Sequence, residues 1–202
     1  MPLLYYRSLE KAEVALWKTQ EPTDFYETEL LKQEFPTTPG AKIRHPEKRR
    51  QWFASRYLLC EVYPAAIQLY HNQKPFLLNG PEVSFSHSSD VVGVMISESH
   101  AGIDLQYPDR KLEKVSSKFL NPGDEGAFGD MPRLDRLTCI WAVKEATFKI
   151  FGAGLPFKSI KLKAYDSVKD EVDVEVEKED ATHRFKLALV FLNDLVLAYL
   201  LK

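Results

Sequence analysis

Two short segments of this chain carry side chains that could bind a divalent metal ion together with a phosphate. The first, residues 102–106 (GIDLQ), places the acid Asp104 in a short apolar stretch. The second, residues 141–149 (WAVKEATFK), carries Glu145 and, one helical turn later, Lys149. Mg²⁺ prefers carboxylate oxygens together with substrate phosphates and water, and a lysine adds positive charge to the same phosphates. The two segments therefore predict metal-assisted chemistry on a phosphate-containing substrate.

Each segment also has the pattern of one element of secondary structure. Successive side chains of an extended strand point to opposite faces, so Asp104 and Gln106 share one face. Residues four apart lie on one side of a helix, so Glu145 and Lys149 are neighbours. That helix is expected over residues 134–151, because apolar residues recur along it with helical spacing and glycines follow it.

Taken alone, each segment has an ordinary structural interpretation. Glu145 and Lys149 fit a solvated surface pair, which contributes little to stability. Asp104 fits a turn residue after Gly102. This interpretation leaves Lys144 on the apolar stripe of the helix, where a snorkelling side chain would have to carry its charge to water. The two segments together favour the metal and phosphate site.

A second set of polar residues precedes the strand. Residues 73–75 (QKP) and 84–88 (SFSHS) supply a lysine, a histidine and several hydroxyl groups. Lys74, Ser86 and His87 are the types of side chain that converge on an anionic ligand. An ordinary polar turn is the alternative interpretation of residues 84–88. A catalytic triad is unsupported, because no nucleophile elbow precedes the serines.

Further upstream lies a basic stretch, residues 42–56, which leads into an apolar helix face. Arg49, Arg50 and Arg56 belong to this stretch. Their spacing fits a phosphate-binding site and a solvated basic helix face equally well.

These segments, in their order along the chain, resemble the motifs of the 4'-phosphopantetheinyl transferases. Members of that family carry Gly-(Ile/Val)-Asp-x-Glu and Trp-(Ser/Ala/Cys)-x-Lys-Glu-(Ala/Ser)-x-x-Lys, preceded by Gly-Lys-Pro and Asn/Ser-x-Ser-His-Ser. The resemblance extends from about residue 49 to residue 160. Two positions depart from the pattern: Gln106 stands where many members have a second Glu, and Gln73 replaces the glycine before Lys74.

The resemblance implies an enzyme, a holo-[acyl-carrier-protein] synthase of the 4'-phosphopantetheinyl transferase kind. Such an enzyme transfers 4'-phosphopantetheine from coenzyme A to a serine of an acyl or peptidyl carrier protein and releases adenosine 3',5'-bisphosphate. The resemblance implies Mg²⁺ bound by Asp104, Glu145 and Gln106, and catalysis by Glu145, Lys149 and Asp104. Glu145, or a water that it orients, would accept the serine proton. Coenzyme A would be held by Lys74, Pro75, Ser86, His87, Arg49, Arg56 and Lys149.

Two other functions are compatible with these residues. Because Gln106 makes one metal ligand neutral, the chain could be a non-catalytic coenzyme A-binding protein of the same fold with a weakened metal site. A generic α+β scaffold with unrelated chemistry would require several motif matches to be accidental.

Helices and antiparallel strands are mixed without a regular βαβ order, which predicts an α+β fold. Residues 12–17 are expected to form a helix, and Asn121 with Pro122 to start another, ahead of a flexible loop over 123–132. The Asp104 strand should join its two predecessors in one small antiparallel sheet. The predicted strands are 3–7, 82–86, 91–97, 102–106, 172–176, 185–189 and 195–200.

The family resemblance adds a division into two halves. Members with chains of this length fold as two similar α+β half-domains, related by a pseudo-twofold axis, with antiparallel sheets and a ligand cleft between them. The resemblance implies an N-terminal half, residues 1–98, that anchors coenzyme A. It also implies a C-terminal half, residues 99–202, with the metal site and the catalytic helix.

Composition narrows the class of protein. With 202 residues, 45% of them hydrophobic, the chain can bury a sizeable core. A net charge of −2 argues against a general nucleic-acid binder, and no apolar run is long enough for a signal peptide or a membrane span. We expect a cytoplasmic protein, for which a monomer suffices. Cys60 and Cys139 are expected to be buried free thiols, although a disulfide between them stays open.

The resemblance also suggests where the protein partner binds. Carrier proteins of this kind are acidic, so a basic or apolar patch should receive them. Lys111, Lys114 and Lys118 are the candidates for such a patch.

Overall fold

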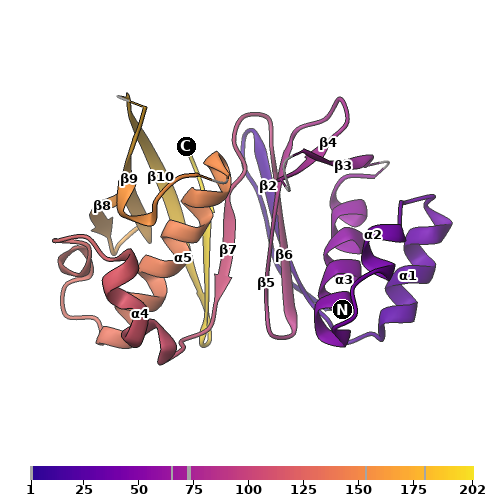
Figure 1. Cartoon of the computed structure of the whole chain (residues 1–202), viewed down its shortest axis with the longest axis horizontal. Helices are drawn as coiled ribbons and strands as arrows, with labels where there is room; N and C mark the ends of the chain where they lie inside the picture. Colours follow the sequence, from indigo (N-terminus) through magenta and orange to yellow (C-terminus); the bar gives the residue numbers. More distant parts are fainter. Residues whose placement is uncertain (1, 65, 72–73, 153, 180) are drawn as a thin grey trace. The chain divides into compact units, whose positions relative to one another are not determined.

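The computed structural model describes residues 2–64, 66–71, 74–152, 154–179 and 181–202. Gln73, one of the two departures from the family pattern, lies outside these residues. The chain divides into two compact units, Met1–Ala101 and Gly102–Lys202 (Figure 1). Each unit combines helices with an antiparallel sheet, so the predicted α+β class is confirmed.

The first unit is built on a four-stranded antiparallel sheet in the order β1-β2-β6-β5. The strands are β1 Leu3–Ser8, β2 Ala12–Lys18, β5 Glu82–Ser88 and β6 Val91–Ser97. The two central strands pair from Ala12↔Ser97 to Lys18↔Val91. Strand β5, which carries Ser86 and His87, is therefore at an edge of the sheet.

Helix α3 packs against this sheet and supplies much of the core. The helices are α1 Thr23–Lys32, α2 Thr38–Ala41 and α3 Pro46–Val62, and a small hairpin follows, β3 Gln68–His71 with β4 Lys74–Leu77. Helix α3 contacts β2, β5 and β6, and α1 packs on α3 (Figure 1). Helix and sheet share one buried cluster, which includes Phe53, Leu58, Leu59, Val92 and Val94.

The prediction of a helix over residues 12–17 is wrong, because this segment is strand β2. Val14, Ala15 and Leu16 are all buried. Alternation marks a strand only where one face is exposed, and three consecutive buried residues remove that signal. The segment becomes a strand because β1 and β6 supply hydrogen-bonding partners on both sides. This tertiary effect outweighs local propensity.

The second unit is built on a five-stranded antiparallel sheet in the order β7-β11-β10-β9-β8. The strands are β7 Ile103–Gln106, β8 Ile160–Asp166, β9 Glu171–Lys178, β10 Ala181–Leu192 and β11 Leu195–Leu200. The helices are α4 Lys111–Phe119 and α5 Arg133–Phe151, with short 3-10 turns η1 Glu125–Phe128 and η2 Phe157–Ser159. Helix α5, which confirms the predicted long helix, packs against β7 and β11 (Figure 1).

The Asp104 strand belongs to this second sheet, so the predicted pairing with its two predecessors is wrong. Strand β7 pairs with β11, and Asp104 lies opposite Ala198. Strands that are close in sequence pair in most proteins. The exception arises here because the division between the two units falls directly before β7.

The segment between α4 and α5 also differs from the prediction. Asn121 begins a turn rather than a helix, and its Nδ2 donates a hydrogen bond to the Ile160 carbonyl at 2.7 Å. The loop expected after it contains η1, and Phe128 is buried, with its ring 4.8 Å from that of Tyr165. Contacts with β8 therefore fold a stretch whose composition is typical of a surface loop.

Cys60 and Cys139 are both free and buried, as predicted. Burial raises the pKa of each thiol to about 12, so neither is reactive at neutral pH. No helix in the described part of the chain has both the length and the apolar character that crossing a membrane requires.

Candidate active site

The expected metal and phosphate ligands of the second unit lie on two adjacent elements, β7 and α5. Asp104 is buried in β7. Lys149 reaches it from α5: its Nζ lies 2.7 Å from Asp104 Oδ1 and donates to the Ile103 carbonyl at 2.8 Å. Part of the lysine side chain stays exposed. The fold therefore brings two of the three expected catalytic residues into direct contact.

Glu145, one helical turn before Lys149, completes this group. Burial raises the pKa of Glu145 above its ordinary value, the negative charge of Asp104 raises it further, and Lys149 lowers it. Asp104 is thus near enough for the two carboxylates to repel each other. A bound cation would relieve this repulsion, because it stabilises both carboxylates in their charged form.

Gln106 shares a face of β7 with Asp104, since strand residues two apart point the same way. Its Nε2 donates a hydrogen bond to the Tyr107 carbonyl at 2.7 Å. The amide nitrogen is engaged in this way, so Oε1 is the atom that could bind a metal ion. This position offers a neutral oxygen where a Glu would offer a charged one.

A glycine at the start of the strand allows α5 to lie this close. A Cβ atom at Gly102 would stand 2.4 Å from the Ala146 carbonyl oxygen and 2.9 Å from Ile150 Cγ1. The first of these atoms belongs to the backbone of α5 and can give way only if the helix moves. Gly102 therefore sets the separation of β7 and α5, and with it that of Asp104 and Glu145.

The donor set suits a small, hard cation. Asp104, Glu145 and Gln106 offer two carboxylates and one amide oxygen, the ligand types that Mg²⁺ prefers. Within the described ranges, no group of three or more His, Cys, Asp or Glu side chains could hold a metal ion. Mg²⁺ commonly completes a small protein contribution with substrate phosphates and water. The residues present fit this ion.

In the first unit, Lys74 and Pro75 line a cavity of about 430 Å³. Lys74 Nζ lies 3.3 Å from Glu82 Oε2, a carboxylate that the sequence motifs do not single out. The cavity combines a cation with mostly apolar walls, which suits an anionic ligand that also has an apolar part. Its other lining residues are His71, Phe76, Glu82 and Val83.

Ser86 and His87 are adjacent in β5 but point to opposite faces of the sheet. Ser86 is buried, whereas His87 is exposed. Glu82, the partner of Lys74, lies at the other end of β5, about 15 Å away along an extended strand. The fold therefore does not gather Lys74, Ser86 and His87 around a single point.

The two arginines of α3 that the resemblance selects lie in different environments. Arg56 is buried, and burial lowers its pKa. Its Nε, Nη1 and Nη2 donate to Gln68 Oε1, Ser55 Oγ and Tyr70 Oη at 3.0, 2.8 and 2.7 Å. Arg56 thereby fastens α3 to β3.

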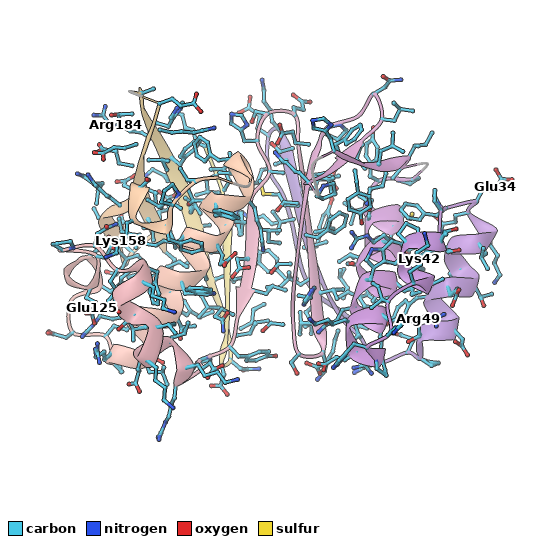
Figure 2. All side chains as sticks on the ribbon, viewed as in Figure 1. Glu34, Lys42, Arg49, Glu125, Lys158 and Arg184 are labelled. Carbon is cyan, nitrogen blue, oxygen red and sulfur yellow. The ribbon has the colours of Figure 1, made fainter. Side chains whose placement is uncertain are left out.

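Arg49 is partly exposed near the start of α3 (Figure 2). Its Nη2 lies 2.8 Å from Glu27 Oε2, while its buried Nε has no hydrogen-bond partner among the described residues. A cavity of about 480 Å³ lies beside it and is also lined by Arg44. Of the two arginines, Arg49 is the one that is partly exposed beside a cavity, so it is the better placed to contact a ligand.

The sequence motifs missed one charged residue close to this site, Asp124. Its Oδ2 lies 2.7 Å from Lys144 Nζ, and both side chains are buried. Asp124 stands in a Gly- and Asp-rich stretch that is typical of a turn. The available signal was Lys144 itself, because a lysine on an apolar helix stripe that cannot reach water requires a buried acid.

Comparison with known proteins concerns the second unit. Residues 101–200 match the sequence model of the 4'-phosphopantetheinyl transferase superfamily. This range contains β7 and α5, and with them the two motifs that carry Asp104, Glu145 and Lys149. No match to the chain is found among curated proteins. Through its C-terminal unit, the chain therefore belongs to the 4'-phosphopantetheinyl transferase superfamily.

Proposed function

We propose that this protein transfers 4'-phosphopantetheine from coenzyme A to a serine hydroxyl of a carrier protein in the presence of Mg²⁺. The observation that carries the proposal is the grouping of Asp104, Glu145 and Lys149 on β7 and α5 of the unit that matches the family. The serine Oγ forms the new bond to phosphorus as the pyrophosphate linkage breaks, and adenosine 3',5'-bisphosphate leaves.

Asp104, Glu145 and Gln106 would hold Mg²⁺, which when bound supplies positive charge against the pyrophosphate of coenzyme A. Glu145 accepts the proton of the attacking serine, directly or through a water that it orients. The repulsion from Asp104 favours binding of a cation between the two carboxylates.

Lys149 binds the phosphoryl group that is transferred. Its ammonium is held at Asp104 and its side chain is partly exposed, which places it to contact a phosphate oxygen. The charge that develops on the phosphoryl oxygens meets a cation that is already in place.

The first unit would anchor coenzyme A, with residues 1–98 as the anchoring half and residues 99–202 as the catalytic half. The cavity at Lys74 and Pro75 supports this assignment. Arg49 fits a phosphate better than Arg56, because Arg49 is partly exposed, whereas Arg56 is buried and bonded to side chains of its own unit. The candidate contacts are Lys74, Pro75, Ser86, His87, Arg49 and Arg56.

The carrier protein would bind at the exposed face of α4. Lys111, Lys114 and Lys118 are exposed, and spacings of three and four residues place them on one side of this helix. A row of positive charges attracts an acidic partner. Reversing all three charges to Glu should raise KM for the carrier and leave coenzyme A binding unchanged. Unchanged carrier affinity would contradict the assignment.

The intact mass of an apo acyl carrier protein tests the function. Incubation with this protein, coenzyme A and Mg²⁺ should add one phosphopantetheine, and a chelator or the Glu145→Ala variant should prevent the gain. Absence of any gain with several carriers, together with coenzyme A binding that does not require Mg²⁺, would instead indicate the non-catalytic binding protein. Gln106→Glu would then be the variant to test for restored transfer.

A further inference from the structure

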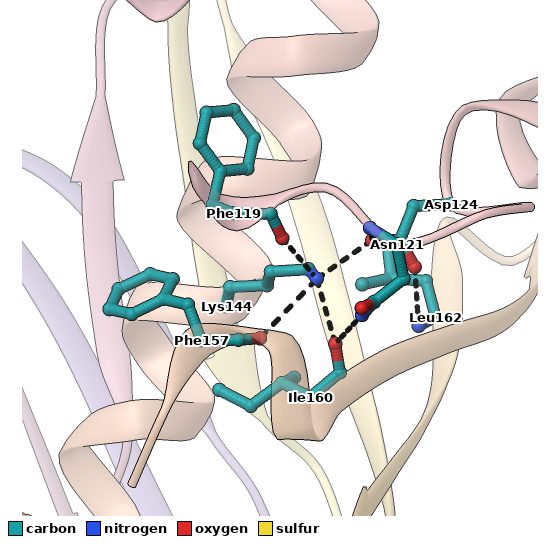
Figure 3. A network of polar contacts seen from close by, with 7 residues as sticks. All are labelled: Phe119, Asn121, Asp124, Lys144, Phe157, Ile160 and Leu162. Atoms are coloured by element: carbon teal, nitrogen blue, oxygen red, sulfur yellow. Dashed lines mark hydrogen bonds and ion pairs between the residues drawn. The ribbon is translucent and has the colours of Figure 1, made fainter. Parts of the chain in front are cut away.

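Lys144 lies in the middle of α5 with no exposed surface. A buried ammonium is unfavourable unless it is paired and hydrogen-bonded. Its Nζ lies 2.7 Å from Asp124 Oδ2 and donates to the carbonyls of Phe119 and Ile160, each at 2.7 Å (Figure 3). The Phe157 carbonyl lies at 3.5 Å. The three N–H groups of this ammonium therefore all have acceptors within reach.

Asp124 is buried like Lys144, and both of its carboxylate oxygens accept hydrogen bonds. Its Oδ2 also accepts a hydrogen bond from the Asn121 backbone N–H at 2.7 Å, and its Oδ1 accepts one from the Leu162 N–H at 3.1 Å. Asn121 Nδ2 donates to the Ile160 carbonyl, which also accepts from Lys144. Both charges are thus satisfied by fixed groups rather than by water.

This network ties together three segments that are separate in sequence. They are α5, residues 119–124 at the end of α4, and residues 157–162 from η2 into β8 (Figure 3). Most of the contacts are to backbone atoms, so the network fixes the course of the chain and not only the positions of side chains.

The same network borders the proposed catalytic face of α5. The ring of Phe157 stacks on those of Trp141 and Phe148, with centroids 5.3 and 5.5 Å apart. Trp141 and Phe148 lie about one turn before and one turn after Glu145, so the Phe157 ring lies on the Glu145 side of the helix. The backbone of Phe157 is next to Lys144 Nζ. The pair therefore acts on both the helix and its aromatic neighbour.

We propose that the Lys144–Asp124 ion pair is a positioning device for the catalytic face of α5. By fixing the rotation and the height of α5 against the two neighbouring segments, it keeps Glu145 close to Asp104. The inference rests on the proposed function, because only that function requires Glu145 to be aligned with Asp104. Lys144 and Asp124 touch no reacting atom, so both are positioning residues.

An apolar pair of similar volume would avoid the cost of burying two charges, which offsets part of the stability lost with the hydrogen bonds. It could not donate to the Phe119 and Ile160 carbonyls, and it could not accept from the Asn121 and Leu162 N–H groups. What the ion pair adds over apolar packing is therefore a defined geometry. This difference makes a positioning role separable from a stabilising one.

Two variants and one control distinguish a positioning role of the ion pair from a stabilising role. K144M/D124L replaces the ion pair with apolar side chains, and D124N keeps the shape of Asp124 without its charge. K161M is the matched control, because it removes an exposed lysine, paired with Glu177, from β8 of the same unit. For each protein we would measure the melting temperature, kcat and KM for coenzyme A with an apo carrier, and hydrogen exchange of backbone amides.

We expect K144M/D124L to stay folded at the assay temperature but to melt below the wild type, because buried backbone groups lose their hydrogen-bond partners. Its kcat should be lower by about 10-fold or more, because small misplacements of catalytic groups slow reactions strongly. KM for coenzyme A should change much less than kcat. D124N should show the same split between kcat and KM at a lower melting temperature. Amides of α5 around Glu145 should exchange faster in both variants, while those of β9 and β10 should not. K161M should match the wild type throughout.

Wild-type kcat in a folded K144M/D124L protein would overturn the proposal, because the alignment of α5 would then not depend on the pair. If K144M/D124L does not fold, wild-type kcat in D124N would overturn it equally. If the wild type transfers no phosphopantetheine to any carrier, the proposed function fails, and hydrogen exchange decides alone. Faster exchange confined to α5 and its contacts then supports positioning, and unchanged exchange of α5 overturns it.

Discussion

Two lysines of helix α5 each pair with an aspartate of another segment, and the same distance of 2.7 Å separates Nζ from the carboxylate oxygen in each pair. The side chains of Lys144 and Asp124 are 0% and 1% exposed, whereas those of Lys149 and Asp104 are 26% and 9% exposed. The first pair is enclosed by backbone groups, and the second keeps an open side. Equal geometry therefore serves different roles, and the enclosure of a pair decides which role it can have.

The physical reason is the response of each pair to loss of one partner. Removing one charge of an enclosed pair leaves the other buried without compensation. Removing one charge of a more open pair lets water take part of its place, so less stability is lost. An open pair can also accept a phosphate or a metal ion as a new partner. Removing a single charge should therefore cost more stability at the first pair than at the second, where the main loss is in turnover.

The largest expected effect is the loss of stability in Lys144→Met. The variant leaves the Asp124 carboxylate buried and unpaired, so the free energy of unfolding should fall by about 3–5 kcal/mol. Chemical denaturation at fixed temperature measures this change. Lys161→Met, which breaks an exposed pair with Glu177, should lower it by less than about 1 kcal/mol. Equal losses in the two variants would remove the distinction between enclosed and open pairs.

Lys149→Met should have its main effect on turnover. Loss of a fixed cation at the developing phosphoryl charge should lower kcat on the order of 100-fold. The free energy of unfolding should fall by less than in Lys144→Met, because this pair is less enclosed than the Lys144–Asp124 pair. Initial rates at saturating coenzyme A and denaturation curves measure the two effects, and Lys149→Arg should keep part of the rate. An unchanged kcat together with a large fall in the free energy of unfolding would contradict the expected difference between the two pairs.

Gly102→Ala should disturb the open pair without touching the enclosed one. The added Cβ meets the Ala146 carbonyl of α5, so the variant should lose about 1–3 kcal/mol of stability, as overpacked sites do. The rate should fall as well, because β7 and α5 move apart. Gly126→Ala is the matched control, since a Cβ there meets nothing within 4 Å. A normal rate in Gly102→Ala would show that the site tolerates a wider separation.

The smallest expected effect concerns Glu145→Gln and pH in the absence of metal. The folded state raises the pKa of Glu145, so the folded protein binds this proton more tightly than the unfolded chain does. The stability that results is fully present below the pKa of Glu145 in the unfolded chain, and it is lost as pH rises through the pKa of Glu145 in the folded protein. The variant avoids this loss, so it should be more stable than the wild type at pH ~7 and no more stable below pH ~4. Thermal melting across this range in a chelator measures the difference. Parallel curves at every pH would contradict the raised pKa that burial and the charge of Asp104 give Glu145.

Most helices and strands of the second unit could be predicted from local pattern. Helix α5 shows apolar residues at helical spacing and ends before Gly152, and β9 alternates between buried and less buried residues, so both were located correctly. Strand β2 was missed because three consecutive buried residues hide its alternation. The partner of β7 was missed because β11 lies at the far end of the chain. Both of these errors occurred where a distant segment supplies the hydrogen bonds.

The sequence by itself determined the chemical groups of the candidate site and their order: Asp104 on a strand, then Glu145 and Lys149 one turn apart on a helix. Tertiary structure alone decided that Lys149 pairs with Asp104, that Glu145 is near enough to feel the Asp104 charge, and that Asp124 is the partner of Lys144. The reason is that enclosure depends on the packing of several distant segments around a group. Residue types and spacing specify which groups are present, but not how much water reaches them.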